Sequence, residues 1–229
     1  MKPYYDHVGI QIYHGDCREI LSLLPKCDAV ISDPPYGMDY NTDGNRFTLG
    51  GRSFQKVHDD NKPFDASPWC DFPYAVLWGF NHYLKGLDPG GVLVWIKRTD
   101  AAFGCFLSDA EVAWVKGTQG IYCFRETIHT IAGFREHPTE KPEGLMRWSI
   151  KHSGAPSDAL IIDPFMGSGT TLVAAKNLGR KAIGIEIEEK YCEIAAKRLS
   201  QEVFNFAEND IPKQLEFSSM GEDKSCTQR

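Results

Sequence analysis

The 229-residue sequence lacks several patterns that would assign it to a common functional class. No apolar stretch approaches the ~20 residues needed to span a bilayer, and no apolar segment follows Lys2 as in a secretory leader. The seven cysteines are odd in number and include no C-x-x-C pair, which argues against a zinc site and a disulfide framework. We therefore expect a cytoplasmic protein with reduced thiols, no metal and no membrane partner.

Positive charge is also scarce, because the formal net charge is −6. Non-specific attraction to nucleic acid depends on clustered lysine and arginine, so any DNA contact has to come from local basic residues. The phosphate-binding pattern G-x-x-x-x-G-K-[ST] is absent as well. A nucleotide bound through its phosphates is therefore not predicted.

The patterns that are present indicate an α/β fold. A β-branched run at 8–13, a helix beginning after Asp16 and an apolar run at 28–32 predict a β-α-β start. Beyond Pro142, two predicted helices alternate with strands at 159–163 and 181–186, and a charged amphipathic helix follows. This alternation predicts a mostly parallel sheet with helices on both faces. In the middle, the segments 111–115 and 121–131 are interpreted as a hairpin that ends the sheet.

Asp33, Pro34, Pro35 and Tyr36 directly follow the apolar run at 28–32. Prolines end a strand, so the simplest interpretation is a structural turn. The alternative is a functional site, because the turn places a carboxylate and an aromatic ring at the end of a buried strand.

A second motif, "DPFMGSGTT", begins at Asp163 and places Gly167 and Gly169 in a turn that opens a helix. Glycines there let a ligand approach the backbone, although a tight turn alone would also need them. Glu186 ends the next predicted strand, where dinucleotide-binding folds hold ribose hydroxyls. Together these residues predict a nucleoside cofactor that requires no pyrophosphate.

Four segments in order carry a family resemblance: "DPPY", "HPTEKP" (137–142), "DPFMGSGTT" and "RKAIGIEIEEKYCEIAAKRL" (180–199). They resemble the beta-class DNA amino-methyltransferases, and the likeness covers most of residues 8–200. It implies a circularly permuted, Rossmann-like sheet of seven mostly parallel strands that binds S-adenosylmethionine. Looser matches in the middle are similar to small phage-encoded adenine methyltransferases, and the family is typical of restriction–modification systems.

The resemblance implies roles for individual residues. The Asp33 carboxylate and the Pro34 carbonyl would accept hydrogen bonds from an exocyclic amino group, Tyr36 would stack on the base rotated out of the duplex, and Pro35 would help fix the loop. The residues expected to bind the cofactor are Asp16, His137, Thr139, Lys141, Asp163, Phe165, Gly167, Ser168, Gly169, Thr170 and Glu186.

Some of these residues have simpler alternatives. Asp16 could only cap a helix, Lys141 could be a solvated cation, and Asp163 could serve the turn rather than the ligand. Glu140 departs from the family, which more often has glutamine at this position of the His-Pro-Thr-x-Lys-Pro run.

The base that is modified is N6-adenine or N4-cytosine, because both use the same amino geometry. Asp33 at the first motif position favours adenine, and the lack of a Pro-Cys pair argues against C5-cytosine chemistry. A non-catalytic DNA-binding or cofactor-binding module on the same fold is the alternative of a different class. RNA or a protein amide is a third possible substrate.

We expect one methyltransferase domain over 1–204 and a polar tail over 205–229. Double-stranded DNA would be read by short segments at about 37–67 and 117–136. Their candidate DNA contacts are Arg46, Arg52, Lys56, Arg125 and Arg135. Such short recognition segments predict a short or relaxed target, or help from a second subunit in a homodimer.

Overall fold

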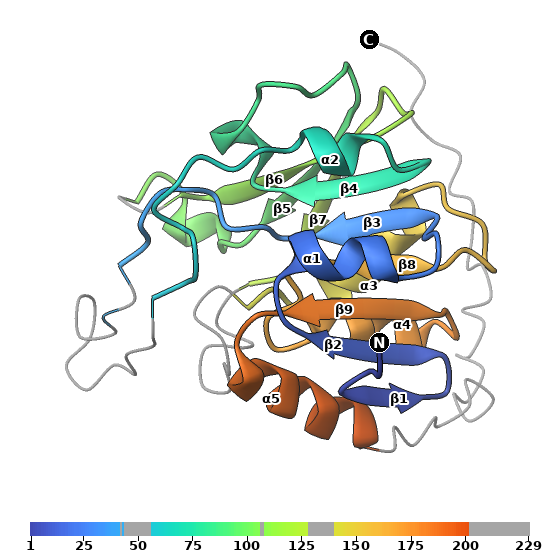
Figure 1. Cartoon of the computed structure of the whole chain (residues 1–229). Helices are drawn as coiled ribbons and strands as arrows, with labels where there is room; N and C mark the ends of the chain where they lie inside the picture. The colour runs from blue at the N-terminus through green and yellow to red at the C-terminus, as the bar shows by residue number, and fades with distance from the viewer. Residues whose placement is uncertain (42, 44–55, 106–107, 128–139, 202–229) are drawn as a thin grey trace, which may run out of the picture.

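One mixed β-sheet forms the centre of the computed structural model, which describes residues 1–41, 43, 56–105, 108–127 and 140–201 (Figure 1). The nine strands within these residues run in the order β1-β2-β9-β8-β3-β4-β6-β5-β7. Their bounds are Tyr5–His7 (β1), Ile10–His14 (β2), Ala29–Ser32 (β3), Tyr74–Trp78 (β4), Gly91–Ile96 (β5), Ala110–Val115 (β6), Ile121–Arg125 (β7), Ile161–Asp163 (β8) and Ala182–Glu186 (β9).

Helices cover both faces of this sheet. In Figure 1, α1 and α2 lie in front of it and α3 and α4 lie behind it. The α-helices are Cys17–Ile20 (α1), Ser67–Cys70 (α2), Glu143–His152 (α3), Thr170–Asn177 (α4) and Glu189–Ser200 (α5), and the 3-10 helices are Leu21–Leu23 (η1), Phe80–His82 (η3) and Asp100–Ala102 (η4). Among the described helices, none has the length and apolar character that crossing a bilayer requires.

The core has two layers because side chains alternate between the faces of a strand. In β3, Val30 packs with Trp69 of α2 on one face. Its neighbour Ile31 belongs to the cluster on the other face, which contains Leu145 of α3 and Leu172 of α4. The nearly continuous apolar run of β3 is therefore explained by burial on both faces.

The predicted α/β fold class is confirmed, with two differences in the sheet. It has nine described strands rather than seven, and β1 is a largely exposed three-residue edge strand without an apolar pattern to predict it. The expected hairpin of 111–115 with 121–131 is wrong: β6 lies between β4 and β5, and β7 pairs in parallel with β5. Ala113, Trp114 and Val115 are fully buried, which favours a position inside the sheet over a place in an edge hairpin.

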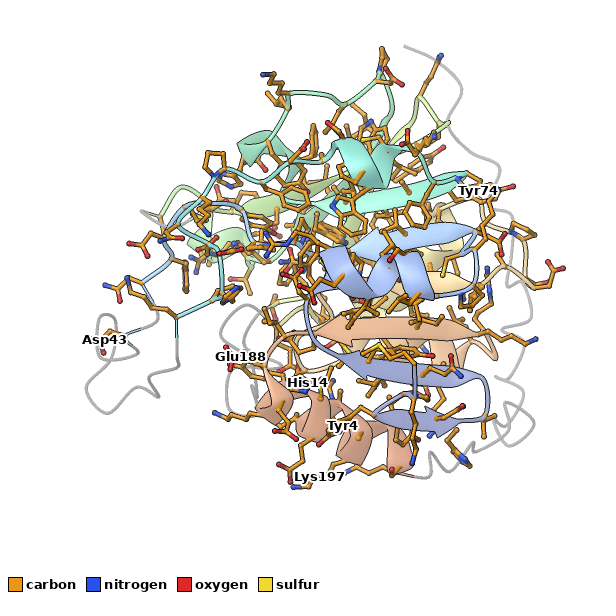
Figure 2. All side chains as sticks on the ribbon, in the orientation of Figure 1. Tyr4, His14, Asp43, Tyr74, Glu188 and Lys197 are labelled. Carbon is orange, nitrogen blue, oxygen red and sulfur yellow. The ribbon has the colours of Figure 1, made fainter. Side chains whose placement is uncertain are left out.

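Five neighbouring strands, β2, β9, β8, β3 and β4, are parallel, so their carboxyl ends meet at one edge of the sheet. Figure 2 shows His14, which ends β2, on the same side as Glu188, which follows β9, while Tyr74 at the start of β4 lies on the opposite side. The His14 imidazole Nε2 lies 3.1 Å from the Ile187 carbonyl oxygen. Ligands of open α/β sheets bind at this edge. The division into a domain over 1–204 and a tail over 205–229 stays a prediction, since 202–229 lie outside the described residues.

Candidate active site

A cavity of about 1130 Å³ opens at the carboxyl ends of the parallel strands. It is lined by segments that follow β2, β3, β4, β8 and β9, together with residues 56–65 and the start of β6. The predicted site residues on its walls are Asp16, Asp33, Pro34, Pro35, Tyr36, Lys56, Lys141, Phe165, Gly167 and Glu186. The fold thus brings the two sequence motifs into one space.

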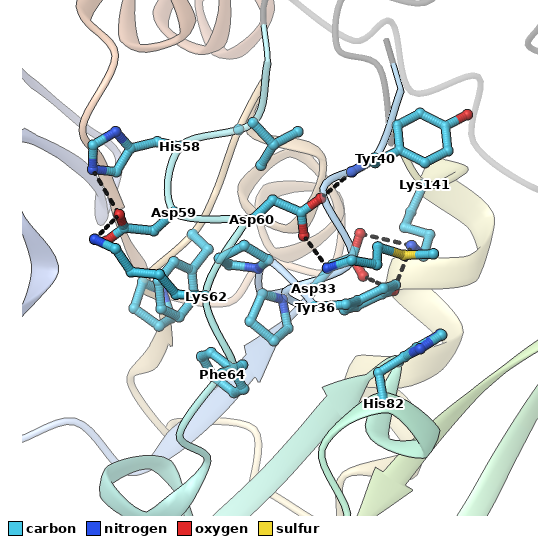
Figure 3. Close-up of a pocket in the computed structure, with 18 of the residues that line it drawn as sticks. Asp33, Tyr36, Tyr40, His58, Asp59, Asp60, Lys62, Phe64, His82 and Lys141 are labelled. Carbon is cyan, nitrogen blue, oxygen red and sulfur yellow. Dashed lines mark hydrogen bonds and ion pairs between the residues drawn. The ribbon is translucent and has the colours of Figure 1, made fainter.

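The Asp33 carboxylate is held from two sides, as Figure 3 shows. Lys141 Nζ lies 2.6 Å from Asp33 Oδ2, and the Tyr36 hydroxyl donates to Asp33 Oδ1. Lys141 also contacts Glu111 Oε2 at 3.0 Å and is only 7% exposed. Because it is buried in ion pairs, Lys141 is not the solvated cation of the alternative interpretation.

Burial and charge act in opposite directions on these groups. Burial raises the pKa of Asp33, and the adjacent Lys141 ammonium opposes that rise. Burial also disfavours the ionised form of Glu111, yet Lys141 and Lys97 lower the pKa of Glu111 to about 2. Lys97 Nζ lies 2.7 Å from Glu111 Oε1. The cluster therefore consists of two cations and two carboxylates that alternate in space.

The Tyr36 ring is placed by two neighbours from the end of β4. It stacks on the His82 imidazole with ring centroids 5.0 Å apart and an interplanar angle of 9°. Gly79 has a φ of +75°, and a Cβ added there would overlap the Tyr36 ring. Gly79 is thus required both for the backbone turn and for the position of Tyr36.

Asp60 anchors the chain that follows the Asp-Pro-Pro-Tyr turn. Its buried side chain accepts hydrogen bonds from Gly37 N at 2.9 Å and from Tyr40 N at 2.7 Å. Residues 37–40 and 56–65 are therefore fastened together beside the cavity, and this anchor was not predicted from the sequence.

Glu186 is fixed by backbone donors. Its Oε2 accepts from Gly167 N and its Oε1 accepts from Glu188 N, both at 2.9 Å. Burial raises the pKa of Glu186 while these hydrogen bonds oppose the rise. The carboxylate consequently links the end of β9 to the glycine turn and faces the cavity.

Asp16 acts as the helix cap that the sequence offered as one alternative, and its contact with the cofactor stays a prediction. It caps α1 by accepting from Arg18 N at 2.9 Å, and it also lines the cavity. The Arg18 side chain pairs with Asp16 Oδ2 at 2.5 Å, and hydrogen bonding from Arg18 lowers the pKa of Asp16.

Asp163, Ser168 and Thr170 lie on a smaller pocket of about 40 Å³ that also touches Asp33 and Lys141. Asp163 Oδ1 accepts from Ser32 Oγ at 2.6 Å and from Phe165 N at 3.2 Å, as expected of a residue that serves the turn. This geometry favours the structural interpretation of Asp163.

Gly169 is not among the residues that line the two pockets, and its contact with the cofactor stays a prediction. Its φ is +81°, and a Cβ there would lie 2.7 Å from the Ala195 Cβ. The glycine is thus needed for packing against α5.

Glu140, which departs from the family pattern, pairs with Arg198 of α5 at 2.9 Å, and the same arginine donates to Ser168 Oγ. The Arg198 guanidinium therefore compensates the additional negative charge of Glu140.

The remaining predicted residues are either outside the described part of the chain or paired elsewhere. His137, Thr139, Arg46, Arg52 and Arg135 lie outside the described residues. Lys56 lines the cavity and pairs with Asp39 at 3.0 Å. Arg125 pairs with Asp100 at 2.6 Å and is not among the residues that line the cavity.

Sequence reasoning missed Glu111, Lys97, His82 and Asp60. Glu111 had a signal, since it is a charged residue at the start of the strand "EVAWV". Its partners Lys97 and Lys141 come from just beyond the end of β5 and from the segment before α3, and no local pattern indicates that these meet.

Comparisons with known proteins agree with this geometry. A family model described as "DNA methylase" matches residues 108–197. The type II methyltransferase M2.DpnII of Streptococcus pneumoniae is 54% identical over 88% of this chain and 93% of its own length. The type II methyltransferase M2.LlaDCHI of Lactococcus lactis subsp. cremoris is 53% identical over 87% of this chain and 93% of its own length.

The chain belongs to the DNA methylase family. The methylase also resembles the solved M1.HpyAVI–SAM complex, with a TM-score of 0.55 at 24% identity over 84% of this chain and all of the other. That likeness concerns the fold. The predictions of an S-adenosylmethionine-dependent DNA amino-methyltransferase, of its cofactor and of DNA as its substrate are confirmed at the level of the family.

Replacing Gly79 by alanine should lower the rate of methyl transfer about 100-fold, because the added methyl group displaces the Tyr36 ring from its place beside Asp33. Transfer of a radioactive methyl group to DNA measures the rate. Gly104→Ala is the matched control, since Gly104 has the same φ of +75° but has no atom within 4 Å of an added Cβ. Equal losses in the two variants would contradict the assigned role of Gly79.

A second prediction concerns Asp163, whose pKa is raised by burial to about 6 from 3.8. Between these values the folded methylase binds more protons than the unfolded chain, so this group lowers stability as the pH rises through about 4 to 6. Asp163→Asn removes that titration. Its free energy of unfolding minus that of the wild type should therefore increase by about 2 kcal/mol from pH 4 to pH 7.

Urea unfolding at several pH values measures this difference. The Asp158→Asn variant, which makes the same change at an exposed position, is the control. A constant difference for Asp163→Asn would show that Asp163 does not titrate in this window.

Proposed function

We propose that this methylase transfers a methyl group from S-adenosylmethionine to the N6 amino group of adenine in double-stranded DNA. The observation that carries the proposal is the Asp33 carboxylate, which lies beside the Tyr36 ring in the cavity that also exposes Gly167 and Glu186. One continuous cavity thus contains both the groups expected to bind the target base and the residues expected to bind the nucleoside cofactor.

The acceptor chemistry depends on Asp33. S-adenosylmethionine, when bound, supplies an electrophilic methyl group. The exocyclic nitrogen of adenine is a weak nucleophile because its lone pair is delocalised into the ring. Hydrogen bonds from its two N–H groups to the Asp33 carboxylate and the Pro34 carbonyl would localise that lone pair and orient it, so that catalysis operates by positioning and electrostatics.

Asp33 retains the capacity for this bond although it already has two partners. A carboxylate offers about four acceptor positions, and Tyr36 and Lys141 each occupy one. Lys141 also favours the ionised form of Asp33. In this form both carboxylate oxygens act only as hydrogen-bond acceptors. We therefore assign Lys141 to Asp33 rather than to the methionine end of the cofactor.

The cavity suits the cofactor in charge and shape. Its wall carries the carboxylates of Asp16, Glu186 and Glu188, which complement a cationic sulfonium ligand, and the ring of Phe165 offers an apolar surface. Glu186 accepts from the backbone N–H groups of Gly167 and Glu188, and a carboxylate has about four acceptor positions, so it can also accept from a ribose hydroxyl. Asp16 would accept from the adenine amino group of the cofactor, whereas roles for His137 and Thr139 remain predictions.

Adenine is preferred to cytosine because the motif begins with Asp33, and N4-cytosine is the alternative base. Lys56, on the cavity wall, is a candidate phosphate contact. Location in the cytoplasm and assembly into a homodimer also remain predictions. Participation in a restriction–modification system is a further prediction. It is supported by two relatives, more than 50% identical to this chain, that are named type II methyltransferases.

Purified methylase, labelled S-adenosylmethionine and unmodified plasmid DNA provide the test, with mass spectrometry of the nucleosides as readout. We expect N6-methyladenine. N4-methylcytosine would overturn the choice of base, and cofactor binding without any DNA label would favour a non-catalytic module.

Asp33→Ala should abolish detectable transfer, because the acceptor of the amino N–H is lost, while the affinity for S-adenosylmethionine changes less than about threefold. Calorimetric titration of the cofactor measures the affinity. The exposed Asp158→Ala variant is the control and should retain both properties. Loss of cofactor binding together with transfer would mean that Asp33 has a different role.

A further inference from the structure

We propose that Glu111 is a positioning residue for methyl transfer, which acts by holding the Lys141 ammonium between two carboxylates. The inference deepens the proposed function and rests on it. It concerns a residue at the start of β6 that belongs to none of the four motif segments.

The geometry around Lys141 carries the argument. Its Nζ donates hydrogen bonds to Asp33 Oδ2 at 2.6 Å and to the Tyr36 hydroxyl at 3.3 Å. It also lies 3.0 Å from Glu111 Oε2, with which it forms an ion pair. The ammonium group is therefore held between the carboxylates of Asp33 and Glu111.

Glu111 is in turn held by a cation of its own. Lys97, just beyond the end of β5, pairs with the other Glu111 oxygen at 2.7 Å, and its side chain is 14% exposed. Lys97, Glu111, Lys141 and Asp33 therefore form an alternating series with no net charge. Such a series avoids the cost of an uncompensated buried charge.

The presence of two anions matters because Lys141 and the substrate compete for Asp33. With Asp33 as its only carboxylate partner, the ammonium would be drawn fully onto the oxygens that have to accept the amino N–H of the base. Glu111 shares the cation, so that Lys141 compensates the charge of Asp33 without occupying it completely. The same anion keeps Lys141 protonated in a buried place, where an isolated lysine tends to lose its proton.

A role of Glu111 as a proton acceptor fits less well. Its pKa is lowered to about 2 by the two lysines, although burial opposes this, so it is a weak base. The geometry and the charge pattern both favour a fixed anion that positions Lys141.

Glu111→Gln tests the inference because it keeps the shape of the side chain and removes its charge. We expect kcat for DNA methylation to fall about 10- to 100-fold, while KM for DNA and the dissociation constant of S-adenosylmethionine change less than about threefold. Unchanged kcat, or a parallel loss of cofactor affinity, would overturn the inference.

The pH profile separates positioning from a general structural role. Asp33, Lys141, Tyr36 and Lys97 are the ionisable groups that face Glu111. Since the Glu111 charge raises the pKa of Asp33, Glu111→Gln should move the acid limb of kcat to lower pH. A lower kcat with an unmoved acid limb would contradict the proposal.

Glu111→Asp keeps the charge and should retain more activity than Glu111→Gln; an aspartate variant no better than the glutamine variant would also overturn the inference. The matched control is Glu193→Gln, which breaks an exposed ion pair with Lys197 of 2.6 Å on α5 and should leave kcat unchanged. The modified nucleoside formed by the wild type tests the proposed function separately, because the ratios of variant to wild type can be measured for either base.

Discussion

The buried ion pair between Lys141 and Asp33 is the interaction on which the site depends. Burial disfavours the ionised form of a carboxylate in this position and raises the pKa of Asp33. The ammonium 2.6 Å away opposes that tendency. The other groups of the cluster can be understood from this pair: Tyr36 donates to the second oxygen of Asp33, and Glu111 balances the charge of the lysine.

The sheet brings the pair together from distant parts of the sequence. Asp33 follows β3 and Lys141 precedes α3, with β4, β5, β6 and β7 between them in the chain. Parallel pairing of β8 with both β3 and β9 then places the glycine turn that follows β8 next to the Asp-Pro-Pro-Tyr turn that follows β3. The short hydrogen bond from Ser32 to Asp163 joins these two strand ends directly. The geometry of the site is consequently a property of strand order rather than of any single loop.

The sequence predicted the elements near its two ends better than those in its middle. The Asp-Pro-Pro-Tyr turn, the glycine turn and Glu186 have local patterns at the ends of apolar strands, and the structure places them on one cavity. The pairing of β6 was not predictable in this way, because a hairpin pattern describes neighbours along the chain and β6 lies between β4 and β5. Glu111 and Asp60 were missed for the same reason, since their roles depend on partners remote in sequence. Gly169 is the opposite case. The sequence shows a glycine in the turn, but the close packing against the Ala195 side chain that requires it depends on a residue remote in sequence.

The central claim is that the Asp33 carboxylate, paired with Lys141, accepts a hydrogen bond from the amino group that is methylated. It is tested most directly by a crystal structure of the protein with target DNA and a cofactor analogue that cannot transfer its methyl group. The account predicts the exocyclic nitrogen at about 3 Å from an Asp33 oxygen and from the Pro34 carbonyl oxygen, with Lys141 still between Asp33 and Glu111. An amino group directed away from Asp33, or bound by Lys141 in its place, would contradict it.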